Sequence, residues 1–116
     1  HNHDFEFIDS DGEIPFDVMM EELDPELVSM EMDLYWVVRA GKDPLAYFEK
    51  YPGRFEQWHV KDMDKSDPGK NTEVGKGSID FKAIFAQAKL SGMKHFYVEQ
   101  EYFTIPSIES AKQCID

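Results

Sequence analysis

Three ionisable side chains lie near the C-terminal ends of three strand-like runs. They are Asp33, His59 and Glu99. One imidazole and two carboxylates form a nitrogen and oxygen ligand set that suits Mn²⁺, Zn²⁺, Co²⁺ or Fe²⁺. Each residue alone is weak support for a metal site, since a single histidine in a strand is commonly a structural hydrogen-bonding group. Their matching position on three consecutive strands predicts that they meet.

Each of these strands has one polar, ionisable face. Polar and apolar residues alternate through 28–34, 57–61 and 96–101, and side chains alternate between the two faces of a strand. An antiparallel sheet with one wetted side explains such a pattern without any function. Strands that alternate with helices favour a parallel sheet covered on both faces instead. Ionisable groups on its inner face then need partners or a metal, since an unpaired buried charge is very costly.

The elements that position these side chains alternate between strand and helix along one domain, residues 1–116. Strands are expected at 1–8, 27–35, 54–60 and 95–100, and helices at 15–23, 43–51, 80–90 and 105–115. The helix starts follow from capping residues such as Asp43 before Pro44, and the polar stretch 61–77 is expected to be a loop. This order predicts an α/β fold with parallel strands and right-handed crossovers.

Two architectures fit this order, a small open α/β sheet and part of a (β/α)8 barrel, also called a TIM barrel. A full barrel takes roughly 250 residues, or about 30 for each βα unit. The 116 residues of this chain therefore have the size of about four units.

The charge of the chain is strongly negative and unevenly distributed. Asp and Glu number 24 against 12 Lys and Arg, and the whole excess lies in residues 1–38, which hold twelve acids and no base. This segment is either a solvated acidic surface or a region that collects cations. An acidic chain disfavours nucleic acid as a partner, because such affinity comes from clustered Lys and Arg.

Other classes are excluded by what the sequence lacks. The single cysteine, Cys114, rules out an internal disulfide framework and a cysteine-based zinc finger. No apolar run reaches the roughly 20 residues of a membrane span, so no membrane partner is expected. No secretory signal is visible, and together with the free cysteine this favours a cytoplasmic location.

Five motifs occur in a fixed order: HNHDFEF at 1–7, MDLYWV at 32–37, WHVKDM at 58–63, VGKGSIDF at 74–81 and VEQE at 98–101. They resemble the C-terminal half of the xylose-isomerase-like barrel superfamily, the sugar phosphate isomerase/epimerase group. The resemblance covers almost the whole chain. It implies that the chain corresponds to strands five to eight of a (β/α)8 barrel.

The resemblance also implies a metal site. Members of this superfamily hold a divalent metal with one residue from each of strands five to eight, usually Glu, Asp, His and Glu. Asp33, His59 and Glu99 match the last three positions, and His1 falls on the first.

The histidine at the first position is a departure from the family pattern. Epimerases of this type use two metal-bound glutamates as acid and base, and only Glu99 matches here. The two-glutamate mechanism is therefore in question, and His3 or Glu6 becomes a candidate for a fourth ligand or a second base.

The activity implied is that of a divalent-metal-dependent sugar or sugar phosphate isomerase or epimerase acting through an enediolate. Expected catalytic residues are Glu99, Lys61 and His3, and expected substrate-binding residues are Trp36, Lys61 and Glu101. An inosose-type dehydratase on a keto sugar or polyol is the alternative, followed by a non-catalytic sugar-binding module or an inactive fragment. The related endonuclease IV branch is disfavoured, because it needs more metal ligands and a basic groove.

The expected partner is a small sugar molecule. A half-barrel leaves strand edges and an inner face open. We therefore expect either a homo-oligomer, in which a second copy completes the barrel, or a longer protein with an N-terminal half-barrel.

Overall fold

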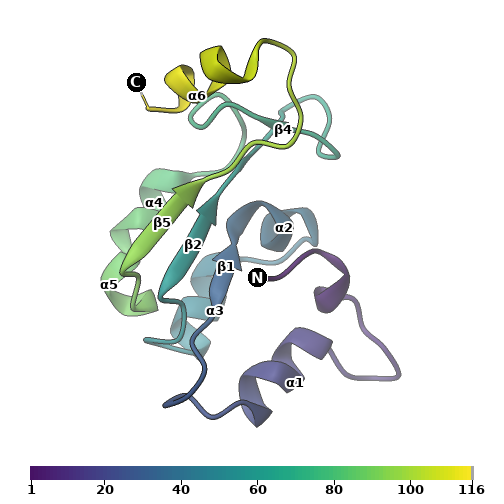
Figure 1. The fold of residues 1–116 in the computed structure, drawn as a ribbon. Helices are drawn as coiled ribbons and strands as arrows, with labels where there is room; N and C mark the ends of the chain where they lie inside the picture. Colours follow the sequence, from purple (N-terminus) through teal and green to yellow (C-terminus); the bar gives the residue numbers. More distant parts are fainter. Residues whose placement is uncertain (116) are drawn as a thin grey trace.

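The fold described by the computed structural model covers residues 1–115 and is built on a parallel sheet (Figure 1). Its strands are β1 (Glu31–Asp33), β2 (Gln57–Val60) and β5 (His95–Val98), in the spatial order β1-β2-β5. All three strands are parallel, with Asp33 opposite His59 and His59 opposite Tyr97. The carboxyl ends of the strands therefore meet at one edge of the sheet.

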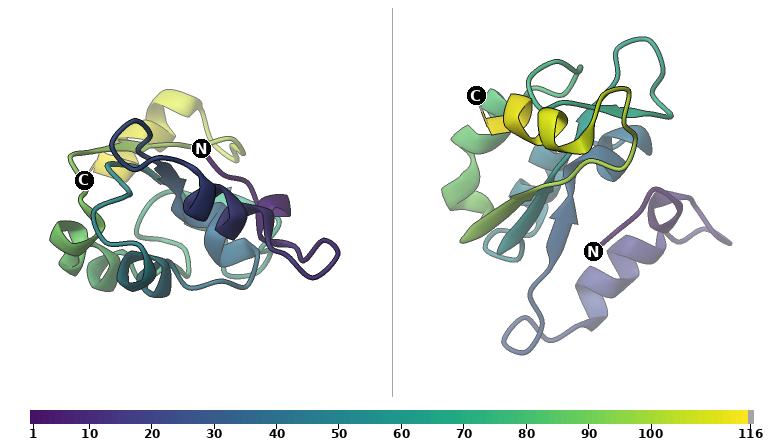
Figure 2. Two further views of the ribbon diagram at one scale, coloured as in Figure 1. Left: turned by 90° about the horizontal axis from the view of Figure 1, so that it is seen from below. Right: turned by 45° about the horizontal axis from the view of Figure 1, so that its top comes forward.

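Helices cover one face of this sheet and leave the other open (Figures 1 and 2). The helices are α1 (Pro15–Glu22), α2 (Leu34–Arg39), α3 (Pro44–Lys50), α4 (Phe81–Ala86), α5 (Ala88–Ser91) and α6 (Ser107–Ile115). The last of them, α6, lies beyond the carboxyl ends of the strands (Figure 1). No helix in residues 1–115 has the length and apolar character needed to cross a membrane.

The helix-covered face is held by a closely packed aromatic core. Trp58 of β2 is fully buried and stacks on Phe48 of α3, with ring centroids 5.2 Å apart. Phe85 of α4 meets the Trp58 ring edge-on at 5.3 Å. Because side chains alternate along a strand, burial of Trp58 on this face directs His59 to the opposite face.

Helix starts agree with the capping residues in the sequence. The side chain of Asp43 accepts a hydrogen bond from the Leu45 N–H with Pro44 between them, and the Asp80 side chain accepts one from Ala83. At the other end of α5, Gly92 adopts a left-handed φ of 84°, as expected for a residue that ends a helix.

The strand predicted at 1–8 is wrong. This segment contains a 3₁₀ helix, Phe5–Phe7, and no strand. The Asn2 side chain pairs with both backbone groups of Asp33, donating to its carbonyl at 3.2 Å and accepting from its N–H at 2.9 Å. An amide side chain thus replaces strand pairing beside β1, and Phe7 turns away to pack on Phe16, with centroids 4.6 Å apart. The described residues accordingly provide three parallel strands and not four.

Other parts of the chain also differ from the prediction, and β2 and β5 are shorter than the strands expected at 54–60 and 95–100. The strand expected at 27–35 is limited to 31–33, because Asp33 caps a helix that begins at Leu34. The helix expected at 80–90 is interrupted at Gln87. The loop expected at 61–77 contains a short antiparallel pair, β3 (Asp62–Met63) and β4 (Asn71–Thr72).

Candidate active site

Asp33, His59 and Glu99 meet on the open face of the sheet. The Nδ1 atom of His59 lies 3.3 Å from Asp33 Oδ2 and 3.2 Å from Glu99 Oε2. Asp33 ends β1 opposite His59 in register, while Glu99 follows the end of β5. Parallel pairing therefore brings together three residues that are far apart in the sequence.

Lys61 lies at the centre of this cluster and is fully buried. Its Nζ atom is 2.9 Å from Glu99 Oε2 and 3.2 Å from both Asp33 Oδ2 and Glu101 Oε2. The ammonium also lies over the rings of Tyr35 and Trp36, 5.6 and 5.3 Å from their centroids. Three carboxylates and two aromatic faces replace the water that a lysine side chain would otherwise need.

A wall of aromatic rings lies beside the cluster and comes from the N-terminal segment and α2. The His1 ring lies 4.5 Å from the His59 ring, and His3 lies 5.2 Å from Trp36. The guanidinium carbon of Arg39 lies 4.9 Å from the centroid of the Trp36 ring. The sequence predicted roles at this site for His1, His3 and Trp36, and these side chains do lie next to it.

Glu6 has a different place from the one considered in the sequence. Its Oε2 atom accepts a hydrogen bond from the backbone N–H of His3, which shapes the turn before Phe5–Phe7. Glu101 is half-exposed and contacts Lys61, so it lies at the rim of the cluster.

Burial and neighbouring charges change the pKa of the site residues in different directions. Burial raises the pKa of Asp33, although Lys61 and the Trp36 N–H oppose this rise. For Glu99, burial raises the pKa, but contact with Lys61 and the charge of His59 outweigh it, so the net pKa is lowered. Burial lowers the pKa of Lys61, yet Glu99 and Asp33 more than compensate and raise it. The lysine is therefore a cation and Glu99 a carboxylate near neutral pH.

The residues at this site fit a divalent cation. Ligand atoms of His1, Asp33 and His59 all lie within 4.8 Å of one another. They offer nitrogen and carboxylate oxygen, the ligands that Mn²⁺, Zn²⁺ and Fe²⁺ accept. The carboxylates of the cluster also outnumber its cations, so an added positive charge is electrostatically favourable.

Two residues of this region were not singled out from the sequence. Glu31 lies on the same strand face as Asp33, and its Oε1 atom is 3.2 Å from His59 Nε2. Period-two alternation in β1 is a signal that could have identified it.

The second is Asp62, which directly follows Lys61 and is fully buried. Its carboxylate accepts hydrogen bonds from four backbone N–H groups, those of Met63, Gly75, Gly77 and Ile79. A Cβ atom on Gly77 would lie 2.2 Å from Asp62 Oδ1, so glycine is required there. No local pattern in the sequence marks this long-range clamp.

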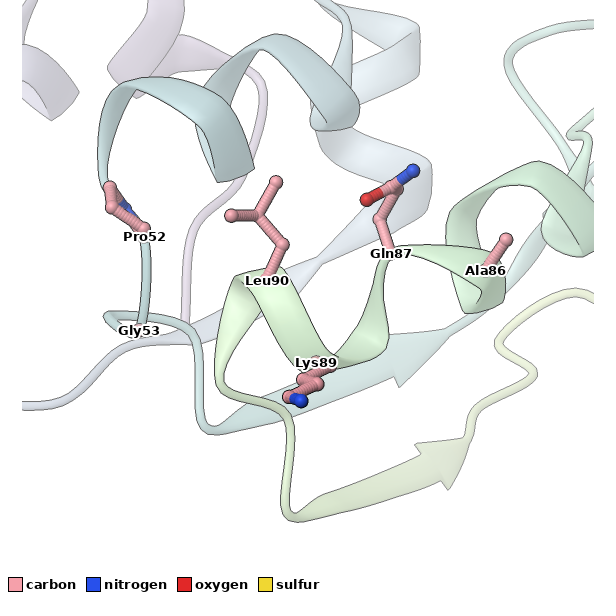
Figure 3. Close-up of a pocket in the computed structure, with 6 residues that line it drawn as sticks. All are labelled: Pro52, Gly53, Ala86, Gln87, Lys89 and Leu90. Atoms are coloured by element: carbon pink, nitrogen blue, oxygen red, sulfur yellow. The ribbon is translucent and has the colours of Figure 1, made fainter.

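A surface hollow elsewhere in the molecule is unrelated to the cluster. It lies where Leu90 of α5 points toward the end of α3 (Figure 3). Its lining is mainly apolar and includes a single ionisable residue, Lys89. This hollow therefore offers no group of ionisable side chains comparable to the cluster on the open face of the sheet.

Comparisons with known proteins agree with this arrangement. No protein-family model matches the sequence. An inosose dehydratase from Lacticaseibacillus casei is 31% identical, and the match covers 79% of this chain and 36% of that protein. An inosose dehydratase from Geobacillus thermodenitrificans is 30% identical, with 84% of this chain and 38% of that protein covered. The chain thus spans somewhat more than a third of the length of these relatives.

Solved structures give the same family relationship. A crystal structure of a sugar phosphate isomerase/epimerase from Parabacteroides distasonis matches with a TM-score of 0.83 and 31% identity. The match covers 98% of this chain and 42% of that chain. A second crystal structure of a sugar phosphate isomerase/epimerase from this organism also gives a TM-score of 0.83, at 28% identity. These matches confirm the resemblance to the xylose-isomerase-like superfamily: the chain is similar to its sugar phosphate isomerase/epimerase proteins and has the fold of a part of such a barrel.

Proposed function

We propose that residues 1–116 form one domain unit of a divalent-metal-dependent sugar isomerase or epimerase. The observation that carries this proposal is the grouping of His1, Asp33 and His59, with Glu99 and Lys61 beside them. The similarity to a sugar phosphate isomerase/epimerase and to inosose dehydratases supports a sugar-modifying enzyme. The chain spans less than half the length of these relatives, so we propose this activity for the whole protein and assign residues 1–116 a part of its active site.

The residues that would hold the metal are His1, Asp33, His59 and Glu99. When bound, a Mn²⁺, Zn²⁺, Co²⁺ or Fe²⁺ ion would act as a Lewis acid on a substrate carbonyl and stabilise negative charge on its oxygen. The imidazole and carboxylate donors of this chain suit each of these ions, so the donor set leaves the choice among them open.

Glu99 is the proposed base. Its lowered pKa keeps it ionised at neutral pH, and its side chain is a third exposed, so a substrate carbon can approach it. It would accept the proton from the carbon next to the carbonyl. Return of this proton to the other face of the same carbon gives an epimer, and its transfer to the neighbouring carbon gives an isomer.

Lys61 is the proposed electrostatic partner of the charge that forms on the substrate. Its raised pKa keeps the ammonium protonated, which excludes it as the base but suits it to stabilise an enediolate oxygen. His3, beside Trp36 and partly exposed, is the proposed second proton-transfer group.

Trp36 and Glu101 are proposed to orient the sugar. The indole ring offers an apolar face to sugar C–H groups, and the half-exposed Glu101 carboxylate can accept hydrogen bonds from hydroxyls. Lys61 links the two, since it contacts the Glu101 carboxylate and lies over the Trp36 ring.

A dehydratase is the second candidate. His1 occupies the place where the family pattern has a glutamate, which leaves Glu99 as the single matching glutamate. The sequence relatives named above are inosose dehydratases. The same enediolate that leads to an isomer can instead expel the hydroxyl on the next carbon, which takes a proton from an acid group, here proposed to be His3, and leaves as water.

We also propose that the open face of the sheet is completed by further protein, either a second copy of this chain or the N-terminal half of a longer barrel. All four residues of β5 are exposed, and in the described residues this strand pairs with β2 alone. A small-molecule sugar is the proposed substrate of the completed site.

The first test is the metal content of protein purified without added metal, measured by plasma mass spectrometry. The proposal expects about one Mn, Zn, Co or Fe per chain, with loss in Asp33→Ala and Glu99→Ala. Glu56→Ala is the matched control, because Glu56 pairs with Lys94 away from the cluster. Absence of metal after soaking with Mn²⁺ and Zn²⁺ would contradict the proposed site.

The second test separates the two reactions. The metal-loaded protein is incubated with keto sugars and inososes in deuterated water, and the products are analysed by mass spectrometry. Deuterium incorporation without loss of water indicates isomerisation or epimerisation, and a product lighter by one water indicates dehydration. Binding without deuterium exchange would support a non-catalytic sugar-binding protein.

A further inference from the structure

The His59 imidazole is held between carboxylates on both sides. Its Nε2 atom lies 3.2 Å from Glu31 Oε1, and its Nδ1 atom lies 3.3 Å from Asp33 Oδ2. Glu31 and Asp33 are two residues apart on β1 and face the same side of the sheet. In register, Asp33 is opposite His59 and Glu31 is opposite Gln57, so the ring spans the two carboxylates diagonally.

The two ring nitrogens have different surroundings. Nδ1 faces the candidate ligands Asp33 and Glu99, whereas Nε2 faces Glu31 alone. An ionised carboxylate only accepts hydrogen bonds, and both nitrogens of His59 face carboxylates in this structure. Nε2 faces Glu31, which lies outside the candidate ligand group, so Nε2 can keep its proton while Nδ1, on the ligand side, would give its lone pair to a bound cation.

Glu31 contacts the histidine without joining the ligand group. It is not a member of the set formed by His1, Asp33 and His59. Among the ion pairs of residues 1–115, its one partner is His59, so no lysine or arginine explains its position. Histidines that bind metals commonly donate their other N–H to a carboxylate, which fixes the ring and raises its basicity.

We propose that Glu31 is a positioning residue that holds His59 with Nδ1 directed to the cation, an inference that rests on the proposed metal site. Glu31 acts through the histidine and does not touch the metal or the substrate. Its side chain is about one-quarter exposed, at 26%, so its removal does not open a cavity in the core.

Calorimetric titration with Mn²⁺ and with Zn²⁺ tests this role in the full 116-residue chain. Loss of such a partner typically weakens metal binding about 10- to 100-fold. We expect this loss in Glu31→Leu, and a smaller one in Glu31→Gln, whose amide oxygen still accepts a hydrogen bond. Glu56→Gln is the matched control, at 33% exposure and paired with Lys94, and should bind as the wild type does.

Nitrogen-15 NMR of the imidazole supplies a readout that a merely structural role would not change. With Zn²⁺ bound, the wild type should show a metal-bound Nδ1 and a protonated Nε2, and Glu31→Leu should lose this preference. If Glu31→Leu does not fold by circular dichroism, the isosteric Glu31→Gln carries both measurements.

The outcomes separate the two proposals. Wild-type binding that both Glu31 variants retain, through the same nitrogen, would overturn the role of Glu31 and leave the metal site intact. A wild type that binds neither ion would overturn the metal site and the role of Glu31 with it.

Discussion

β2 and β5 are neighbours in one sheet and have the same length, but they differ in how they are packed. β2 alternates between half-buried and buried residues, and its Trp58 is fully buried and packs against aromatic rings of α3 and α4. All four residues of β5 are exposed, including Phe96 at 49% and Val98 at 42%.

This difference divides the candidate site into two parts. Asp33 and His59 lie on the well-packed pair of strands, β1 and β2, whereas Glu99 follows the exposed strand β5. Side chains on a closely packed scaffold keep their geometry, and those on a weakly packed edge open more easily. Asp33 and His59 are therefore held in place by the packing of this chain, whereas Glu99, which we propose as both a ligand and the base, lies on the less constrained part of the site.

The largest expected effect compares the two strands directly. Trp58→Ala should lower the free energy of unfolding by about 3–5 kcal/mol, because it removes a fully buried ring from the core. Phe96→Ala should lower it by less than about 1.5 kcal/mol, because half of this ring is already exposed. Urea unfolding followed by circular dichroism measures both values, and equal losses would contradict the comparison.

The next effect concerns the chain just beyond β2. Asp62→Asn should cost about 2–3 kcal/mol, because the buried carboxylate accepts four charge-assisted hydrogen bonds from backbone N–H groups. Asp64→Asn is the control, since Asp64 caps an open turn at Ser66, and its effect should be much smaller. Urea unfolding of both variants tests this, and similar midpoints would refute the clamp.

A smaller effect lies on the helix-covered side and depends on pH. Burial, followed by the charge of Asp17, raises the pKa of Tyr47 from 10.0 to about 12. The stability that this gives is complete below pH 10 and is lost as pH rises toward 12, because the unfolded tyrosine ionises first. The loss should reach about 2 kcal/mol relative to Tyr47→Phe, measured by urea unfolding along this pH range. A difference between the two proteins that does not change with pH would contradict it.

The smallest effect on stability is expected at the open edge. Val98→Lys should change the free energy of unfolding by no more than about 0.5 kcal/mol, because Val98 is 42% exposed. A lysine on an edge strand opposes pairing with another strand. If a second copy completes the barrel, sedimentation should give a dimer for the wild type and a monomer for Val98→Lys. A wild type that stays monomeric at all concentrations would exclude this version of the proposal.

Much of the secondary structure could be predicted from the sequence, because its signals are local. Asp43 before Pro44, Asp80 and Gly92 each lie within a few residues of the backbone groups that they cap or end. The convergence of Asp33, His59 and Glu99 followed from period-two alternation and from parallel order. The error at residues 1–8 has a long-range cause: the alternation of this segment is typical of a strand, yet the Asn2 side chain satisfies the backbone of Asp33, 31 positions away.

Residue types and their spacing were enough to predict the α/β order, the polar face of the strands, the candidate ligands and the resemblance to the barrel superfamily. These depend on spacing and residue type, which are present before the chain folds. Three features became visible in the folded chain alone: Lys61 is buried among three carboxylates, Glu31 faces the second nitrogen of His59, and Asp62 clamps a distant turn. Contacts of this kind join residues that are at least 13 positions apart. Asp62 and Gly75 are 13 positions apart, and Asn2 and Asp33 are 31 positions apart. Their geometry depends on how strands and loops pack, and no short-range pattern carries that information.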